Sequence, residues 1–370
     1  MKKNYLASWI TPGVALFIFI LAAIFIKDLS KWTILQYYTY ILHPPLFDVS
    51  TTGQIGDTIG GTTAPFIALV AGFLTFVAFW AQLRANEQVR DQFKIQQFES
   101  QYFEMIRLHK ENINEMKITG YHYLKSVTIS ETGRQEFTTT TTRTETERVI
   151  DGRKVFVTMV TELNACFEFC TVYAKKFNVP EPELTKIAYQ IFFFGSFSHL
   201  VNGVNYRNFV KHCKTELKKI RKAHRNSSGG VKIFDVENRK IKVHIKYAPF
   251  SGHESRLAHY YRHLFSTVKF VVKKEKEGLF DYKQSREYLK ILRAQMSNDE
   301  QIMLYHNYIS GIGADWEKPD NLFLTKYRML HNLPIDSVLY VEPPRTHFAG
   351  KIEQIKKGIK EDPLFEWGDN

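Results

Sequence analysis

The stretch "FSGHESRLAHYYRHLFSTVKF", residues 250–270, concentrates side chains that could transfer protons or bind anions. On a helix, Arg256, His259 and His263 would share one face, opposite an apolar face. Histidine exchanges a proton near neutral pH, and arginine binds phosphate in a fork. The pattern predicts a candidate functional face, to which Arg293 adds from a later segment. Its members are His253, Arg256, His259, Arg262, His263 and Arg293. A polar surface between packed elements is the alternative.

A second candidate is "RNFVKH", residues 207–212, within the very basic segment "RNFVKHCKTELKKIRKAHR". Arg207 and His212, with the polar Asn208 between them, match the motif of the all-helical HEPN ribonucleases, in which four to six residues separate arginine from histidine. The same spacing recurs at Arg239 and His244. The spacing alone is therefore not specific. We keep a ribonuclease activity at Arg207 and His212 as one of two hypotheses for the function.

Other chemistry-bearing patterns favour structural roles. Cys166 and Cys170 lie one helical turn apart and Cys213 follows His212, which a zinc site could use, but buried free thiols explain them more simply. Ser297 and Glu300 fit the two positions of a capping box. The glycines of "GQIGDTIGG" lack the lysine and serine or threonine of a phosphate loop. We therefore expect no metal and no cofactor, and the catalytic residues, if any, remain unknown.

The elements that position these residues begin with two apolar segments. Residues 62–81 carry no charge and would span about 30 Å as a helix, the thickness of a bilayer's hydrocarbon core. Residues 9–26 are also uncharged and predict a second transmembrane helix, with a cleaved signal peptide as the alternative. Ala68 and Gly72, one turn apart, would allow close packing between copies of the later span.

The basic residues beside the spans predict their orientation. They are Lys2 and Lys3 before the first span, Lys27 and Lys31 between the spans, and Arg84, Arg90 and Lys94 after the second. The positive-inside rule then leaves both termini in the cytoplasm and the linker outside. We expect a multi-pass membrane protein, with a membrane region at 1–82, a helical cytoplasmic domain at 83–340 and a tail at 341–370.

The composition of the remainder predicts a basic, mainly α domain. The formal net charge is +12 and the pI is near 9.3, which favours anionic lipid headgroups or nucleic acid as neighbours. Helical patterns alternate with a small β-hairpin, "VKIFDV" and "KIKVHIKY", and helices are expected again from residue 251 to about 331. The Thr-rich stretch 128–156, with Asp151-Gly152, predicts a surface loop or a second hairpin.

Several segments in order resemble the putative phage abortive infection protein family, a bacterial family with an N-terminal membrane region. They are "GQIGDTIGG" with its span, "QQFESQYFEMIRLHKENI", "AYQIFFFG", "FSGHESRLAHYYRHLF" and "LRAQMSNDEQIMLYHNYIS". The likeness runs from about residue 53 to 334 and weakens in the Thr-rich stretch and the tail. It implies antiphage defence by shutdown of the infected cell, and it supplies no catalytic residues.

Two mechanisms follow from these observations. In the first, the cytoplasmic domain senses infection and the membrane region contributes to cell shutdown. In the second, the chain is a membrane-anchored HEPN-like ribonuclease. The partners expected are membrane lipids, further copies of the chain, an anionic ligand or nucleic acid, and proteins encoded beside it in a defence system.

Overall fold

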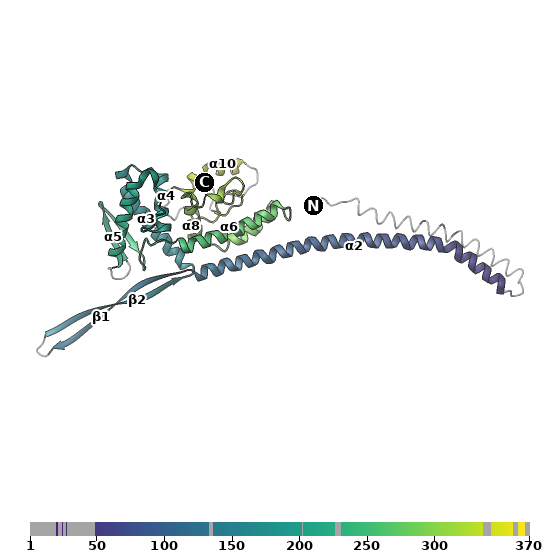
Figure 1. Ribbon diagram of the computed structural model, residues 1–370, viewed down its shortest axis with the longest axis horizontal. Helices are drawn as coiled ribbons and strands as arrows, with labels where there is room; N and C mark the ends of the chain where they lie inside the picture. The colour runs from purple at the N-terminus through teal and green to yellow at the C-terminus, as the bar shows by residue number, and fades with distance from the viewer. Residues whose placement is uncertain are drawn as a thin grey trace. The chain divides into compact units, whose positions relative to one another are not determined.

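A computed structural model describes residues 49–132, 136–201, 203–225, 231–335, 342–357 and 362–366, together with Ile20, Ile24 and Lys27. The described chain is mostly helical, which confirms the mainly α fold class (Figure 1). It divides into two compact units, residues 1–94 and residues 95–370. Each unit is described by itself below.

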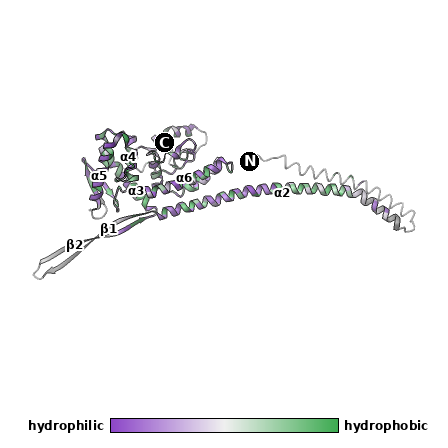
Figure 2. Cartoon of the chain, viewed as in Figure 1, coloured by the Kyte–Doolittle hydropathy of each residue, from purple (hydrophilic) through white to green (hydrophobic). Residues whose placement is uncertain are grey.

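The first unit contains most of helix α2, Val49–Glu115, which includes the expected span at 62–81. Apolar side chains are exposed along this stretch, where Figure 2 colours the helix mostly green. They are Phe66, Ile67, Leu69, Leu74, Phe76, Phe79 and Leu83. The described residues do not bury this surface, and by its length and composition the helix could cross a membrane. The other expected span, 9–26, lies outside the described residues except for Ile20 and Ile24.

The second unit is a helical bundle around α3, Lys154–Ala174. This helix packs against α4, Glu181–Phe194, α5, Arg207–Arg225, and α8, Asn298–Ile309. It is also long and apolar enough to cross a membrane. It is mostly buried in the bundle, however, and is therefore a core helix. The remaining helices are α6, Glu254–Lys276, α7, Tyr282–Arg293, α9, Pro344–His347, and α10, Ala349–Lys357.

The last part of α2 belongs to this bundle. A stripe of apolar side chains at helical spacing is buried: Phe98, Tyr102, Ile106, Ile113 and, just beyond the helix, Met116. Ile95, one turn before Phe98, stays partly exposed. Phe98 packs between Phe270 of α6 and Tyr288 of α7. This stripe is therefore a core face of the bundle.

Two antiparallel hairpins complete the unit. Strand β3, Val231–Val236, pairs with β4, Arg239–His244, around Glu237 and Asn238, whose φ angles of 44° and 66° suit a two-residue hairpin turn. The predicted small hairpin is therefore confirmed. The Thr-rich stretch also forms a hairpin, β1, Lys117–Thr132, with β2, Glu136–Asp151. Its Asp-Gly pair is not the hairpin turn, because Lys117 pairs with Asp151 and Gly152 leads into α3.

The expectation of helices as far as about residue 331 is wrong after α8. Residues 310–335 contain only a short 3-10 helix, Ala314–Glu317, among turns. The sequence there, "SGIGADWEKPDN", explains the difference, because glycine and proline disfavour a helix interior. Several side chains of this irregular segment, including Trp316, Phe323 and Leu330, are nevertheless buried in the core.

Candidate functional site

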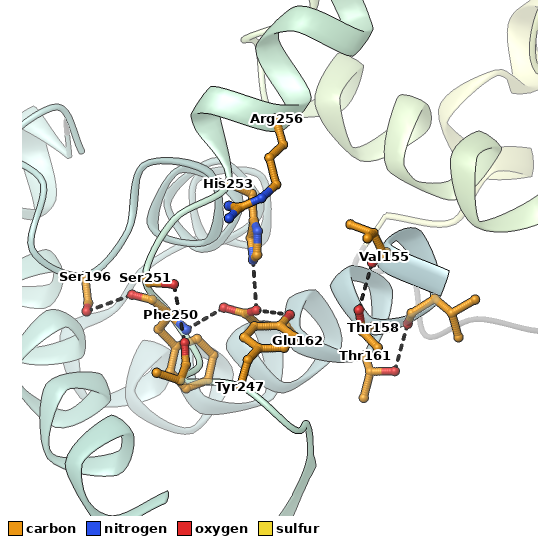
Figure 3. Close-up of polar contacts among 12 residues, drawn as sticks. Val155, Thr158, Thr161, Glu162, Ser196, Tyr247, Phe250, Ser251, His253 and Arg256 are labelled. Atoms are coloured by element: carbon orange, nitrogen blue, oxygen red, sulfur yellow. Dashed lines mark hydrogen bonds and ion pairs between the residues drawn. The ribbon is translucent and has the colours of Figure 1, made fainter. Parts of the chain in front are cut away.

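Glu162 of α3 is a fully buried carboxylate that joins this helix to residues 247–253, the segment ahead of α6 (Figure 3). It accepts hydrogen bonds from the Tyr247 hydroxyl and from the backbone N–H of Phe250, and its Oε2 lies 2.9 Å from Nε2 of His253. Burial, and then the neighbouring carboxylate, raise the pKa of Tyr247, so the hydroxyl keeps its proton and donates. A buried carboxylate needs such partners, because an unpaired charge in the core is very costly.

Two glycines bring His253 to this carboxylate. Gly195 ends α4 with φ 91° and Gly252 precedes α6 with φ 93°, a region that disfavours a Cβ. A Cβ on Gly195 would lie 2.5 Å from the Ser251 carbonyl oxygen, and one on Gly252 would lie 2.7 Å from the Phe194 carbonyl. The backbone N–H of His253 donates to Phe193 over 2.8 Å. The segments "AYQIFFFG" and "FSGHESR" therefore cross in backbone contact.

The predicted face on α6 contacts the C-terminal end of α2 and the start of β1. The Arg256 Nε donates to the Lys117 carbonyl over 2.7 Å, and Nε2 of His259 lies 3.3 Å from Oδ1 of Asn112. One turn further, the imidazole of His263 stacks on that of His109, with centroids 6.0 Å apart. We call the pairs Arg256–Lys117, His259–Asn112 and His263–His109 the α2–α6 seam. The structure thus brings together three of the six predicted residues.

A second buried carboxylate, Glu300, lies behind the seam. It accepts hydrogen bonds from Tyr260 over 3.0 Å and Ser297 over 3.1 Å. Nε of Arg153 lies 3.6 Å from its Oε1, and Nε2 of His109 lies 4.0 Å from its Oε2. The predicted cap is present, because the Ser297 hydroxyl accepts from the backbone N–H of Glu300. The carboxylate itself does more than cap, since it also binds α6 through Tyr260.

The titration of this cluster is set mainly by burial. Burial raises the pKa of Glu300, and burial, followed by the nearby His263 and Arg153, lowers the pKa of His109 to about 4. Burial also lowers the pKa of His263. Both imidazoles are therefore neutral at neutral pH. Neither ring nitrogen of His109 has a hydrogen-bond partner among the residues that the structure describes.

The arrangement favours coupling between elements over reaction with a substrate. Glu162, His253 and Glu300 are at most 1% exposed, so a dissolved substrate does not reach their polar atoms. Of the groups around Glu300, the Arg153 side chain faces solvent and is 54% exposed. The buried carboxylates Glu162 and Glu300 and their partners instead connect α2, α3, α6 and α8 to one another.

The other predicted residues lie in different surroundings. Arg293 is buried and donates to the carbonyl of Arg328 over 2.9 Å, and burial lowers its pKa to about 10. Arg262 is exposed beside an apolar pocket of about 290 Å³ lined by Phe193, Phe265 and Trp316. These two residues and His253 are thus not part of the seam.

The ribonuclease pair has divided surroundings as well. Arg207 lines a basic pocket on α5, whereas the imidazole of His212 packs against Tyr173 and Phe177, with centroids 4.6 and 5.4 Å away. The Nε2 atom of His212 is buried and has no hydrogen-bond partner in the described part of the chain.

The cysteines beside this pair are buried free thiols. Cys166 donates to the carbonyl of Ala188 over 3.4 Å. Across the described ranges, no group of three or more His, Cys, Asp and Glu side chains is placed to hold a metal ion.

Ala68 and Gly72, which are expected to pack against another copy of the span, are both exposed on α2. Nothing lies within 4 Å of a Cβ built on Gly72. Among the described residues a Cβ at this position therefore has open space, which makes Gly72 a suitable position to test contacts between copies.

Sequence reasoning missed Glu162, His109 and Arg153. Glu162 is the one acidic residue in the apolar run "VFVTMVTELNACF", which was a usable signal of a buried, paired carboxylate. His109 and Arg153 gave no signal, because their partners come from helices far away in the sequence.

Residues 252–338 match the family model described as putative phage abortive infection protein. The resemblance is therefore confirmed for this segment, which contains the seam residues of α6 together with Glu300. No curated protein and no solved structure matches the chain.

Proposed function

We propose, on the strength of the match to the putative phage abortive infection proteins, that this protein is an antiphage defence protein anchored in the bacterial inner membrane by α2. The helical unit receives an infection signal, and the membrane region contributes to shutdown of the infected cell. The proposed anchoring rests on one observation: between residues 62 and 81, α2 carries no charge and its apolar side chains are exposed. Water would solvate such a surface at a large cost, which a bilayer removes.

The α2–α6 seam supports a route for the signal. Helix α6 lies in the segment that matches the family. Its seam partners His109 and Asn112 belong to α2, the helix that also contains the proposed span. Two of the three seam contacts are exposed hydrogen bonds, those of Arg256 and His259, and each contributes only about 1 kcal/mol. A ligand or partner that contacts these side chains could therefore rearrange the seam without unfolding the core.

The ribonuclease alternative has weaker support. A catalytic arginine and histidine must act on the same phosphodiester, yet Arg207 lines an open basic pocket while the His212 imidazole packs against two aromatic rings. The two mechanisms also differ in what fails first in the infected cell.

The deciding experiment follows both quantities in one infected culture. Cells expressing the protein are infected, and membrane potential, by a voltage-sensitive dye, and ribosomal RNA integrity, by electrophoresis, are recorded over time. The proposal expects the potential to fall while RNA is still intact. Intact potential with fragmented RNA would favour the ribonuclease. Cells carrying an empty vector control for damage caused by the phage itself.

The orientation is tested separately with reporter fusions. A fusion after Asn370 is expected to be active in the cytoplasm, and fusions within residues 31–50 are expected to be active outside it. A linker reporter active in the cytoplasm would contradict the two-span topology.

A further inference from the structure

The connector between α4 and α5 exposes three apolar side chains within eight residues. Phe197, Leu200 and Val204 are 57%, 55% and 68% exposed. A single exposed apolar residue is ordinary, but a group of them marks an interaction surface. Gly203 holds the connector against α5, because a Cβ there would lie 2.6 Å from Cγ2 of Val210. The connector thus packs against α5, while these three side chains stay more than half exposed.

The adjoining face of α5 is basic. A pocket of about 430 Å³ on it is lined by four cations, Arg207, Lys211, Lys214 and Lys218, and by Thr215. Their spacing of four, three and four residues places the cations along one side of the helix. Val204 lines the same pocket, so the apolar connector and the basic face are continuous. We call these three apolar residues and four cations the basic–apolar face.

No carboxylate that the structure describes neutralises the positive charge of this face. Within the part of the chain that the structure describes, none of the four cations forms an ion pair, and no carboxylate lines the pocket. Lys214 donates to the carbonyl of Ser198, and both burial and the adjacent Lys218 lower its pKa. Like charges held this close are stabilised by an anion between them.

The apolar and cationic groups also touch one another. The Lys218 ammonium lies 4.6 Å from the ring centroid of Phe197, and the Arg221 guanidinium lies 5.3 Å from it. Cations that flank exposed apolar side chains are the pattern of proteins that bind a membrane interface, where the apolar groups enter the headgroup region and the cations bind lipid phosphates.

We propose that the basic–apolar face docks on the surface of an anionic phospholipid bilayer. This is a second membrane contact, made by the helical unit and separate from the α2 span. The face is complementary to such a bilayer in both charge and polarity. Leu200 and Val204 favour lipid over single-stranded nucleic acid, because aliphatic side chains offer no ring on which a base can stack. Each cation near an anionic surface strengthens binding roughly fivefold.

The test uses the full-length chain with one added label. Leu200→Cys is labelled with an environment-sensitive fluorophore, which the native cysteines do not compete for because all three are buried. The labelled protein is reconstituted into vesicles of phosphatidylcholine alone or of phosphatidylcholine mixed with phosphatidylglycerol. We expect a blue shift, and quenching by spin-labelled lipid, only with phosphatidylglycerol, and we expect both to disappear at high ionic strength. Ile233→Cys, on the exposed side of β3, is the matched label control.

Charge reversal identifies the cations responsible. Lys211→Glu with Lys218→Glu should abolish the shift, whereas Lys219→Glu should keep it, because Lys219 lies on the same helix outside the pocket and pairs with Glu216. A label unaffected by phosphatidylglycerol overturns the proposal. So does a shift of equal size in phosphatidylcholine, or a response to single-stranded RNA alone. Carbonate extraction of the vesicles reports anchoring by α2 independently of the label.

Discussion

Nε2 of His253 lies 2.9 Å from Oε2 of Glu162, and both side chains are buried where α3 meets the start of α6. The same carboxylate binds the Tyr247 hydroxyl and the Phe250 backbone N–H. One side chain of α3 therefore fixes the path of residues 247–253, and with it the direction in which α6 leaves.

Glu162→Gln should destabilise the helical unit strongly. An amide cannot accept from all three partners, and its NH₂ group would face donors, so we expect a loss of about 3 kcal/mol in the free energy of unfolding. Thermal and urea unfolding of the detergent-solubilised protein measure it. Glu168→Gln, on the exposed side of the same helix, is the matched control and should change little. Equal effects of both substitutions would contradict the role given to Glu162.

Gly252→Ala should also destabilise the unit, for two separable reasons. The φ of 93° disfavours any Cβ, and this Cβ would in addition meet the Phe194 backbone. Gly278→Ala isolates the first effect, because its φ is 77° and nothing lies within 4 Å of its Cβ. We expect about 1 kcal/mol for Gly278→Ala and at least about 2 kcal/mol for Gly252→Ala, measured by unfolding. A smaller effect at Gly252 would show that the backbone crossing is loose.

Stability should fall as the pH is lowered from about 6.5 to about 4, in part through His109. Its folded pKa is about 4 and its ordinary value is 6.5, so the unfolded chain binds the proton first and stability is fully present only above pH 6.5. The raised pKa of Glu300 acts in the opposite sense and offsets part of the loss. His109→Gln should flatten the fall in melting temperature over this range. His199→Gln, an exposed histidine, should leave the slope unchanged.

Gly72→Leu tests contacts between copies of the span. Among the described residues, nothing outside the adjacent helix backbone lies within 4 Å of a Cβ at this position, and leucine favours a helix interior, so we expect the variant to fold and insert. If Ala68 and Gly72 pack against a second copy, the larger side chain should separate the helices and abolish protection in a phage plating assay. Ala81→Leu, on the opposite side of the helix, should protect as well as the unchanged chain. Cross-linking in membranes should show the same difference, and full protection by Gly72→Leu would argue against this packing.

The seam variants separate signal transmission from RNA cleavage. Arg256→Ala removes the contact of α6 with the Lys117 carbonyl of β1, and His263→Ala removes the contact of α6 with His109 of α2. We expect each variant to lose protection at normal protein level and helicity. Arg262→Ala is the control on the same helix, because the hydrogen bond that its Nε makes within the described part of the chain stays inside α6, to the carbonyl of Ala258. His212→Ala should keep protection. Loss of both protection and RNA cleavage with His212→Ala would instead support the ribonuclease hypothesis.

Local patterns in the sequence predicted the elements well because their causes are local. The absence of charge between residues 62 and 81, the alternation around residues 231–247, and the apolar spacing from Phe98 to Ile113 each follow from which side chains a helix or strand must bury. The helix expected beyond residue 310 did not form, because glycine and proline outweigh a short apolar pattern there.

The arrangement of the candidate site was decided by tertiary structure. The sequence by itself determined that residues 253–263 form a helix with a polar face of arginine and histidine, because helical periodicity depends only on neighbours a few residues apart. Which groups that face meets depends on residues far away in the chain: Asn112 and His109 from α2, and the Lys117 carbonyl from β1. The burial of Glu162 and Glu300 has the same origin, since a carboxylate is stable in a core only where packing brings donors from other elements to it.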